Sequence, residues 1–270
     1  MKIREVKDAW ETTRQGSDRN WRQQWNRRTT VRLFAEEGAK VAIMARREEQ
    51  GEAVQNAVRD QGGIAEFIRC DVTEPQEISA AVEKVVEVFG GVDVLFNNAG
   101  TAGPESFPEE SRKQWDNIID VNLNGVFEMS TKVWPYMVER GGGAIVNMSS
   151  GAAVGGFTPF LKGILGRVPP ASYYVAKAGV DALTRWTAGL GGEVNIRVNG
   201  VRPGQIITPL ADREGTGRHG LEKLFDVIQI MEGRGYPIDV AKAVLFLSCE
   251  DSRFVTGEIL NIDGGLVDKL

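Results

Sequence analysis

Tyr173 and Lys177 lie four residues apart in the segment ASYYVAKAGVDALTRW. On an α-helix this spacing puts both side chains on one face, where they can share a site. A phenol titrates at about pH 10 in water, and a neighbouring ammonium favours the phenolate. We therefore expect Lys177 to lower the pKa of Tyr173 toward the range in which tyrosine shuttles protons at neutral pH. An ordinary surface helix with a solvated lysine is the alternative.

The chain has one histidine, His219, in the loop ADREGTGRHG. A Ser/His/Asp hydrolase would have to use that residue, and an HExxH metal site is impossible. We expect His219 to be exposed and to take no part in catalysis. Proton chemistry in this chain must therefore use other bases.

Two further groups of polar residues sit where a site is expected. Ser149 and Ser150 follow the predicted strand 144–148, and open α/β sheets bind ligands at the carboxyl ends of their strands. A hydroxyl there can polarise a carbonyl, whereas turn-forming serines are the alternative. Asn122 lies in a helical pattern that asparagine disfavours, which predicts a role such as ordering a water in a proton relay. A harmless exposed asparagine is the alternative reading of that position.

The elements that must position these residues alternate between short β-branched runs and longer amphipathic stretches. This pattern is typical of βαβ units winding a parallel sheet. We predict an α/β fold: a doubly wound parallel sheet in a single Rossmann-like three-layer domain. Helices are expected at 47–61 and 74–89, closed by Gly62 and Gly90 as left-handed caps. The predicted strands are 40–45, 65–70, 92–96, 144–148, 195–201 and 259–262.

Seven motifs occur along the chain in this order: CDVT, NNAG, VNLNGVF, a Ser-Ser pair, YxxxK, PGxxxT and TGxxLxxDGG. Together they resemble the short-chain dehydrogenase/reductase family over most of the chain. The resemblance implies hydride transfer between NADP(H) or NAD(H) and a carbonyl or secondary alcohol. It implies these roles: Tyr173 as acid/base, Lys177 as its tuner and ribose ligand, Ser150 (Ser149 as second choice) as carbonyl donor, and Asn122 as relay.

The cofactor is expected to lie along the ends of the predicted strands. Small residues after strand 92–96 allow close backbone approach, and Thr73 and Gln76 are expected to form a capping box on the next helix. That box would leave the Asp71 carboxylate free for an adenine amino group. The resemblance adds a clasp on the nicotinamide carboxamide, and simple turns are the alternative throughout. The expected cofactor contacts are Asp71, Val72, Asn98, Ala99, Gly100, Pro203, Gly204, Ile206 and Thr208, beside Tyr173 and Lys177.

The residues after strand 40–45 bear on the choice of cofactor. An acidic residue there would bind the ribose 2'-hydroxyl, but this chain has Arg46 and Arg47. Cations at a helix start are disfavoured by the helix dipole, so a nearby anion would explain them. We predict NADP(H) over NAD(H), with Arg46 at the 2'-phosphate. Surface arginines paired with Glu48 or Glu49 are the alternative.

Residues 1–28 do not fit this pattern. They hold three of the six tryptophans and no apolar run that could be a strand or a signal-peptide core. The resemblance implies a first strand and a TGxxxGxG loop before the helix containing 31–37, where this chain has WRQQWNRR. Without that loop, the backbone donors for a pyrophosphate are missing. A non-catalytic protein of the same fold is therefore the alternative function.

A reading-frame shift would explain the anomaly. Tryptophan has the single codon TGG, so reading one nucleotide later turns Trp21 and Trp25 into glycines four residues apart. With suitable codons for residues 14–28, the shifted frame reads GKVAIVTGGSNGIG, a family-like strand and glycine loop. We predict an out-of-frame segment at 1–28 and a dehydrogenase-like domain at 29–270. A divergent natural arm is the alternative.

Composition limits the partners and the compartment. Lys and Arg total 32 against 37 Asp and Glu, a net charge of −5, so there is no overall electrostatic case for nucleic acid or anionic lipid. The chain is 42% hydrophobic and has no apolar run of about 18 residues, which argues against disorder and membrane spans. Cys70 and Cys249 lie far apart, which suits a reducing cytosol. We predict a cytoplasmic homo-oligomer, a dimer or the family's usual tetramer, acting on a small molecule.

The substrate itself stays open at this point. A steroid, a sugar, an acyl thioester and an aromatic diol all fit the predicted chemistry. The segment FTPFLKGILGRVPP between Ser150 and Tyr173 is apolar and longer than the family spacing implies. It is expected to form either a wall of the substrate pocket or an oligomer contact.

Overall fold

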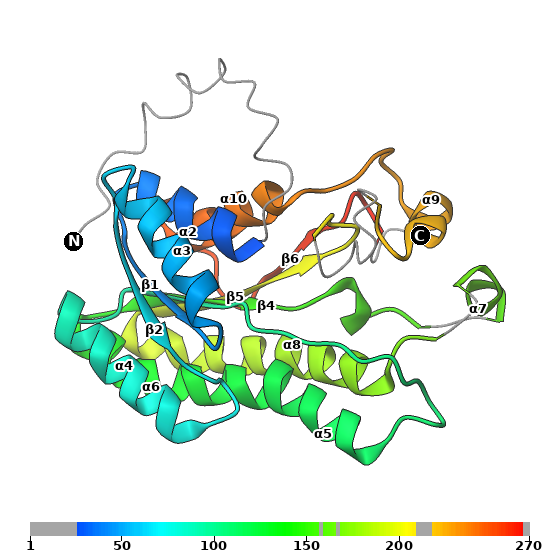
Figure 1. Ribbon diagram of the computed structural model, residues 1–270, viewed down its shortest axis with the longest axis horizontal. Coiled ribbons are helices and arrows are strands. Elements are labelled where there is room, and N and C mark those ends of the chain that lie inside the picture. The colour runs from blue at the N-terminus through cyan, green and yellow to red at the C-terminus, as the bar shows by residue number, and fades with distance from the viewer. Residues whose placement is uncertain (1–25, 157–158, 166–167, 209–217, 267–270) are drawn as a thin grey trace.

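A middle layer of parallel strands organises the protein (Figure 1), of which the computed structural model describes residues 26–156, 159–165, 168–208 and 218–266. The strands of these residues are β1 Lys40–Ala45, β2 Ile64–Arg69, β3 Val94–Asn97, β4 Gly143–Met148, β5 Ile196–Pro203 and β6 Ile259–Ile262. All the pairings between them are parallel. The predicted α/β fold with a parallel sheet is confirmed, and the predicted strand ends differ from the observed ones by at most two residues.

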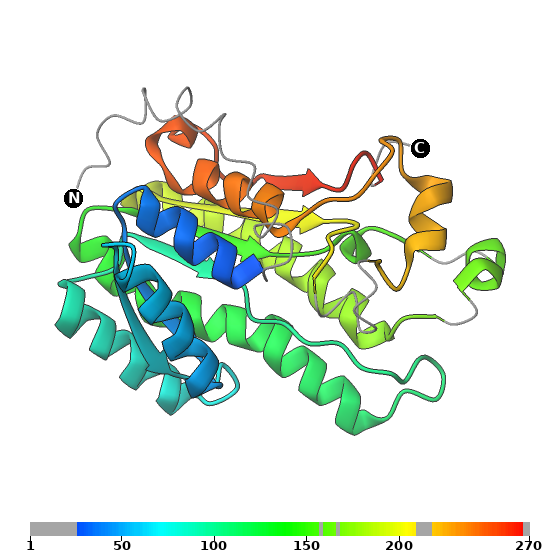
Figure 2. The same cartoon turned by 45° about the horizontal axis from the view of Figure 1, so that its top comes forward.

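Helices cover both faces of the strands (Figures 1 and 2). One face carries α2 Asn26–Glu36, α3 Glu48–Arg59 and α10 Pro237–Ser248. The other carries α4 Pro75–Phe89, α5 Arg112–Ile119, α6 Gly125–Glu139 and α8 Ala171–Gly191. Two short helices, α7 Pro159–Leu165 and α9 Glu222–Ile228, contact each other at the end of the molecule where β5 and β6 terminate. Segment 157–170, predicted as a pocket wall or oligomer contact, thus contains α7.

The strands fall into two groups. β1 pairs with β2, and β3, β4, β5 and β6 pair in that order. Among the described residues no backbone pairing joins β1 to β3. This interruption lies where the family resemblance implies the first strand, which would have to come from residues ahead of α2. Residues 1–25 lie outside the described part of the chain.

Both faces of β4 are buried, as expected for a parallel strand with helices on either side. Ile145 packs into a cluster with Ile78 of α4 and Met137 of α6. The next residue, Val146, faces the other way and packs with Val244 of α10. Because successive side chains of a strand point to opposite faces, this one strand joins the two cores.

The ends of α4 test two cap predictions. Gly90 has φ of 83° and closes the helix through its N–H to Val86, so its predicted left-handed cap is confirmed. Gly62, after α3, also has a positive φ of 81°. The predicted capping box of Thr73 and Gln76 is wrong: α4 starts one residue later, at Pro75, and its N-cap makes no side-chain hydrogen bond. A proline at the first helical position has no N–H that needs a cap.

Three composition-based expectations can be compared with the structure. None of the helices in the described residues is long and apolar enough to cross a membrane. Nor do three or more His, Cys, Asp or Glu side chains of those residues gather as a metal site. Cys70 and Cys249 are both buried free thiols.

Candidate active site

Tyr173 lies in the first turn of α8 and its hydroxyl hydrogen-bonds with Ser150, which follows β4. Part of the ring is exposed, but the protein desolvates the hydroxyl. Desolvation raises the pKa of Tyr173, and the hydrogen bond with Ser150 only partly opposes it. The direction is opposite to the one predicted from Lys177. The structure thus holds Tyr173 as a protonated phenol, which is the form that can donate a proton.

Lys177 lies one turn further along α8 and is almost fully buried. Its Nζ donates a hydrogen bond to the Met148 carbonyl at 2.7 Å and lies 5.8 Å from the centre of the Tyr173 ring. Burial lowers the pKa of Lys177 to about 8, and the nearby Asp181 carboxylate opposes that shift. Tyr173 and Lys177 therefore share one site, as their spacing predicts.

The two serines after β4 have different surroundings. Ser149 is buried, and its N–H and hydroxyl donate to the carbonyls of Val201 and Lys177, at 2.8 and 3.4 Å. Ser150 is less buried, and its hydroxyl bonds to Tyr173 while accepting from the Ala152 N–H. Ser149 ties β4 to its neighbours, whereas Ser150 faces the reactive side chain.

Asn122 is fully buried, so the reading as an exposed asparagine is excluded. It lies in a π-helical turn, Asp120–Asn124, between α5 and α6. Its amide donates to the Ile118 and Thr101 carbonyls, both at 2.9 Å, and accepts from the Thr101 N–H at 3.3 Å. Turns of this type are rare and occur often at functional sites. The unfavourable asparagine was the sequence signal, although it did not predict the π-turn.

Gly100 brings the loop after β3 against this group. A Cβ built on Gly100 would lie 3.1 Å from Asn122 Oδ1 and 3.8 Å from Lys177 Nζ. The preceding Asn98 and Ala99 are half-buried. Three segments far apart in the chain thus converge at the carboxyl ends of β3 and β4, where open α/β sheets bind ligands.

The predicted nicotinamide clasp begins where β5 ends, at Pro203. Gly204 packs against the turn after β6, because a Cβ on it would lie 2.7 Å from Asp263 Cβ. The next residue, Gln205, is buried, and its Nε2 has no hydrogen-bond partner. Ile206 is buried and bridges to Gly235, and Thr208 ends this described run. An orphaned amide donor therefore lies within the segment that the resemblance assigns to the carboxamide.

Asp71 does not have the free carboxylate that was predicted. One carboxylate oxygen accepts from the N–H and hydroxyl of Thr73, at 3.0 and 2.9 Å, and the other lies 3.4 Å from Arg46. Partial burial raises the pKa of Asp71, but the Thr73 and Arg46 contacts outweigh it and the pKa is lowered. The prediction failed because Thr73 bonds to Asp71 instead of capping α4. Val72 packs beside α6, its carbonyl 3.0 Å from a Cβ built on Gly125.

Sequence reasoning missed a buried amide network beneath this site. Asn97 at the end of β3 donates to Ser130 Oγ at 3.0 Å and to Asn147 Oδ1 at 2.9 Å. Asn147 in β4 donates in turn to Thr184 of α8 at 2.9 Å. The network connects β3 and β4 to the helix that carries Tyr173. An asparagine inside each apolar strand was the available signal.

The prediction that His219 is exposed is wrong. The ring is half-buried, stacks edge-on against Phe225 at 4.9 Å, and accepts the Leu221 N–H at 3.0 Å. Burial lowers its pKa to about 4. His219 is therefore a neutral packing residue beside α9. Residues 211–217 of the same loop lie outside the described part of the chain.

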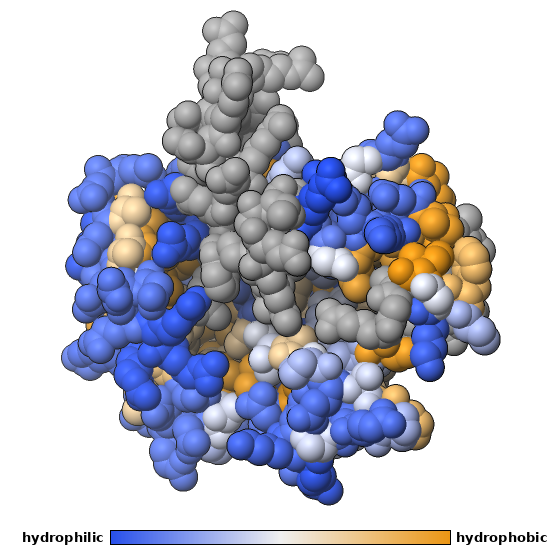
Figure 3. Space-filling model, turned by 45° about the vertical axis from the view of Figure 1, so that its right-hand side comes forward, coloured by the Kyte–Doolittle hydropathy of each residue, from blue (hydrophilic) through white to orange (hydrophobic). Residues whose placement is uncertain are grey.

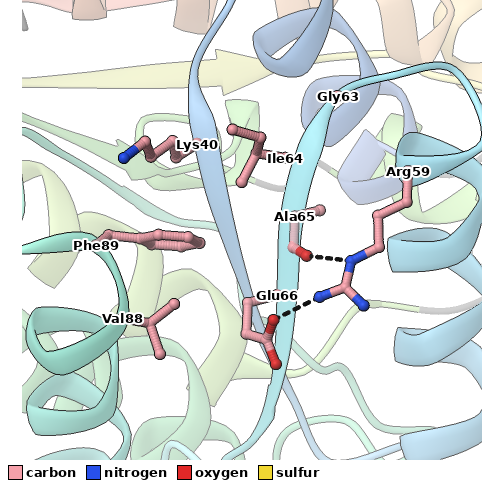
Figure 4. A pocket seen from close by; sticks show the side chains of 8 residues that line it. All are labelled: Lys40, Arg59, Gly63, Ile64, Ala65, Glu66, Val88 and Phe89. Carbon is pink, nitrogen blue, oxygen red and sulfur yellow. Dashed lines mark hydrogen bonds and ion pairs between the residues drawn. The ribbon is translucent and has the colours of Figure 1, made fainter.

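A hollow of about 350 Å³ lies at the opposite ends of the strands (Figure 4). Lys40 and Ile64, the first residues of β1 and β2, line it together with Phe89 of α4. Arg59 and Glu66 pair across one side of it. None of its lining residues belongs to the group around Tyr173, so we place the chemistry at the carboxyl ends and not in this hollow.

Comparisons with known proteins agree with this geometry. The model of the enoyl-(acyl carrier protein) reductase family matches residues 28–267. A 3-oxoacyl-(acyl-carrier-protein) reductase from Thermotoga maritima is 38% identical over 245 residues, covering 89% of this chain and 92% of that protein. A 3-alpha-(or 20-beta)-hydroxysteroid dehydrogenase from Mycobacterium bovis is 35% identical over 241 residues, covering 89% of this chain and 84% of that protein.

Solved structures give the same result. A gluconate 5-dehydrogenase from Burkholderia cenocepacia, in complex with NADP and tartrate, superposes with a TM-score of 0.80 at 28% identity, covering 90% of this chain and 91% of that one. A short-chain dehydrogenase/reductase from Burkholderia xenovorans gives 0.79 at 33% identity, with 88% of each chain covered. The chain belongs to the short-chain dehydrogenase/reductase family. It is an NAD(P)-dependent oxidoreductase of carbonyl and alcohol groups.

The described residues fit one half of such a cofactor. Gly100 leaves the space of a Cβ open beside Lys177 and Asn122, and Gln205 offers a buried unpartnered donor. The pyrophosphate half has no such fit among the described residues, because the first of them already belong to α2, whose sequence NRRTTVRLFAE has no glycine. The two halves of the expected cofactor groove thus differ in this chain.

Proposed function

We propose that the protein reduces a carbonyl compound with NADPH, and oxidises the corresponding secondary alcohol in reverse, with Tyr173 as the acid/base. The observation that carries this proposal is the hydrogen bond between Tyr173 and Ser150, with the Lys177 ammonium beside the same ring. When bound, the reduced nicotinamide supplies the hydride. Tyr173 gives its phenolic proton to the carbonyl oxygen, and Ser150 donates a hydrogen bond to that oxygen.

Lys177 and Asn122 are proposed to support this proton transfer. An ammonium beside the ring stabilises the phenolate left after Tyr173 has given up its proton. Lys177 would also hold the ribose hydroxyls next to the nicotinamide. The Asn122 carbonyl oxygen faces the gap between Gly100 and Lys177, and we assign it to ordering a water that returns a proton to the site.

We propose NADP(H) as the preferred cofactor. The residue directly after β1 is the exposed Arg46, where an acidic residue would be needed to receive a ribose 2'-hydroxyl. Its pairing with Asp71 at 3.4 Å favours a position near the adenosine end of the groove. We assign the remaining cofactor contacts to Asp71, Val72, Asn98, Ala99, Gly100, Pro203, Gly204, Ile206 and Thr208.

A non-catalytic protein of the same fold is the second candidate. It is favoured because no pairing among the described residues joins β1 to β3 and because α2 contains no glycine. We propose that residues 1–28 are an out-of-frame segment ahead of a dehydrogenase domain at 29–270. Sequencing the gene across the codons for Asp8 to Val31 tests this directly. If the gene encodes residues 1–28 and the following domain in one reading frame, with no nucleotide lost or gained between them, the proposal is contradicted.

We further propose that the protein is a cytoplasmic homo-oligomer. Phe127 and Val138 of α6 are exposed and eleven residues apart, which places them on one side of the helix. Val175, Trp186 and Leu190 form a similar exposed stripe on α8. Apolar stripes of this kind mark contacts with another protein surface, here a second copy. Buried free thiols at Cys70 and Cys249 suit a reducing compartment.

A second apolar surface lies near α7 and α9, and Figure 3 shows hydrophobic residues gathered on this flank. Its exposed members are Phe160, Val227, Ile230 and Met231. This surface supports both earlier readings of segment 157–170, as a wall for an apolar substrate or as a contact between subunits. We therefore keep steroids, sugars, acyl thioesters and aromatic diols in the substrate panel.

The function is tested by titrating the purified protein with NADPH and NADH and following oxidation of each with that panel. We expect saturable NADPH binding and turnover with at least one carbonyl substrate. Binding without turnover on any member of the panel would favour the non-catalytic candidate. Cleavage of an acyl thioester without NADPH oxidation, lost on replacing His219 and not on replacing Tyr173, would point to a hydrolase instead.

A further inference from the structure

The helix that carries Tyr173 does not cap its own start. Its N-cap residue is Pro170, which makes no side-chain cap hydrogen bond. The first N–H groups of a helix have no partner within the helix and need acceptors from elsewhere. Ser172, immediately before Tyr173, is fully buried, so water cannot meet this need.

Glu110 supplies the missing acceptors from the segment between β3 and α5. One carboxylate oxygen accepts the Ser172 N–H at 3.2 Å, and the other accepts the Ser172 hydroxyl. The Ala171 N–H adds a further backbone contact. Partial burial raises the pKa of Glu110, but these bonds and one from Gln114 outweigh it and hold the pKa below its usual value. Glu110 is thus an anion at the positive end of the α8 dipole, a favourable arrangement.

Glu110 is itself held in place. Gln114 of α5 donates to Glu110 Oε1 at 3.1 Å and to the Glu105 carbonyl at 2.9 Å, while its own carbonyl accepts the Glu105 N–H at 3.0 Å. Gly103 packs against the same amide, since a Cβ there would clash with Gln114 Oε1. The loop that follows Gly100 is therefore tied to α5 and, through Glu110, to α8.

Tyr173 and Lys177 are held in place by different contacts. Lys177 is fixed to β4 by its bond to the Met148 carbonyl. Tyr173 lies a full turn nearer the helix start, next to the residue that Glu110 holds. A tilt of this first turn would move the phenol relative to Ser150 while leaving Lys177 in place. Misplacement of a reacting group by about 1 Å can cost about 100-fold in rate.

We propose that Glu110 is a positioning residue for Tyr173, setting the first turn of α8 through Ser172 so that the phenol stays aligned with Ser150 and the bound carbonyl. The proposal rests on the proposed function, in which Tyr173 is the acid/base. Glu110 itself touches neither substrate nor cofactor in this role.

The test compares Glu110→Ala and Glu110→Gln with the control Glu109→Ala, a change at the exposed neighbouring carboxylate. We measure kcat, KM for the carbonyl substrate and Kd for NADPH, well below each variant's Tm. Glu110→Ala should lower kcat about 10- to 100-fold with KM and Kd within about twofold. Glu110→Gln keeps an acceptor oxygen and should recover part of the loss. Glu109→Ala should match the parent.

A double-mutant cycle separates this proposal from the proposed function. In a Tyr173→Phe background, Glu110→Ala should have almost no further effect, because the group that it positions is already gone. If Tyr173→Phe keeps full activity, the proposed function fails. If Tyr173→Phe is impaired while Glu110→Ala turns over normally, the positioning role alone is overturned.

Ser172→Ala is a second, milder test of the same contact, for use if the Glu110 variants do not fold. It keeps the backbone bond to Glu110 and removes only the hydroxyl bond, so it should lower kcat in the same direction by a smaller factor. A loss that appears in Kd for NADPH, or an unchanged kcat for Ser172→Ala when Glu110→Ala does not fold, would overturn the role.

Discussion

The carboxyl ends of β3 and β4 contrast with the neighbouring edge of β1. Around β3 and β4 the polar groups are interlocked: Lys177 is bonded to Met148, Asn122 to Thr101, and Asn97 to Asn147. Beside β1, no backbone pairing among the described residues leads to β3, and Arg46 at the end of β1 lies 3.4 Å from the half-buried Asp71. One region holds the residues that we propose for catalysis, while its neighbour has no described element to hold a pyrophosphate.

This contrast separates two requirements that are usually met together. In the proposed function, proton transfer uses residues that α8, β4 and the π-helical turn position, and all of these come after residue 90. For the cofactor, the family resemblance implies backbone donors ahead of α2, in residues that lie outside the described part of the chain. The chain can therefore retain the chemistry of its family and still bind its cofactor weakly.

The largest effect is expected at the intact region. Tyr173→Phe should lower turnover by about two to four orders of magnitude while NADPH binding is kept, because a positioned acid/base contributes about that much. Stopped-flow turnover and equilibrium NADPH titration measure the two quantities separately. Turnover at the parent rate in this variant would remove Tyr173 from the mechanism.

The next largest effect is expected at the interrupted region. A chain with GKVAIVTGGSNGIG in place of residues 14–27, the exchange chain, should bind NADPH about 100-fold tighter or more, since each hydrogen bond to a charged phosphate contributes roughly 1.5 kcal/mol. It should also melt several degrees higher, because a central strand would join β1 to β3. NADPH titration and thermal denaturation of both chains test this. Equal, tight binding by the parent chain would contradict the frame-shift argument. Where parent turnover is too low to measure, the other variants are made in the exchange chain.

A smaller effect is expected from Arg46. Arg46→Asp should shift the ratio of kcat/KM for NADPH over NADH toward NADH by about tenfold, because a carboxylate repels the 2'-phosphate and accepts from a 2'-hydroxyl. Arg47→Asp makes the same change of charge one residue later and should shift the ratio less. Equal ratios in the parent and Arg46→Asp would mean that Arg46 is a surface charge only.

The smallest effect is a pH dependence. Burial lowers the pKa of Lys177 to about 8, so its ammonium is present below that pH and is lost as the pH rises through it. Because the cation stabilises the Tyr173 phenolate, kcat/KM should decline above about pH 8, at most tenfold per pH unit. The profile of kcat/KM against pH measures this limb. A profile that stays flat to about pH 10 would show that the charge on Lys177 is not needed.

Periodicity and motif order predicted much of this molecule. β1 and β6 contain β-branched residues between polar segments, which predicts strands at these positions. The four-residue spacing of Tyr173 and Lys177 places both on one face of a helix, whatever the tertiary structure around them. Local patterns of this kind involve only a few adjacent residues. They can therefore be recognised without knowledge of the tertiary structure.

What the sequence did not predict depends on contacts between distant segments. The prediction of a free Asp71 carboxylate failed because Thr73 donates its N–H and hydroxyl to that carboxylate and does not cap α4. The pKa of Tyr173 moved opposite to expectation because desolvation, which a sequence does not display, outweighed the hydrogen bond with Ser150. His219 was expected in solvent because it lies in the polar loop ADREGTGRHG, yet it packs against Phe225. Glu110 and Ser172 are 62 residues apart, and no pattern in either segment signals their bond.

The pairing of Asn97 with Asn147 has a consequence for how the strands find their partners. The two residues face each other in the register of β3 and β4, and Asn147 reaches Thr184 from the same position. If one of the two strands slipped by one residue, its amide would turn to the opposite face, away from its partners. An unpaired buried amide costs about 1–3 kcal/mol, so misaligned pairings of these two strands are selected against during folding. Asparagines inside these two otherwise apolar strands thus specify the register of β3 and β4, which valine or isoleucine could not do.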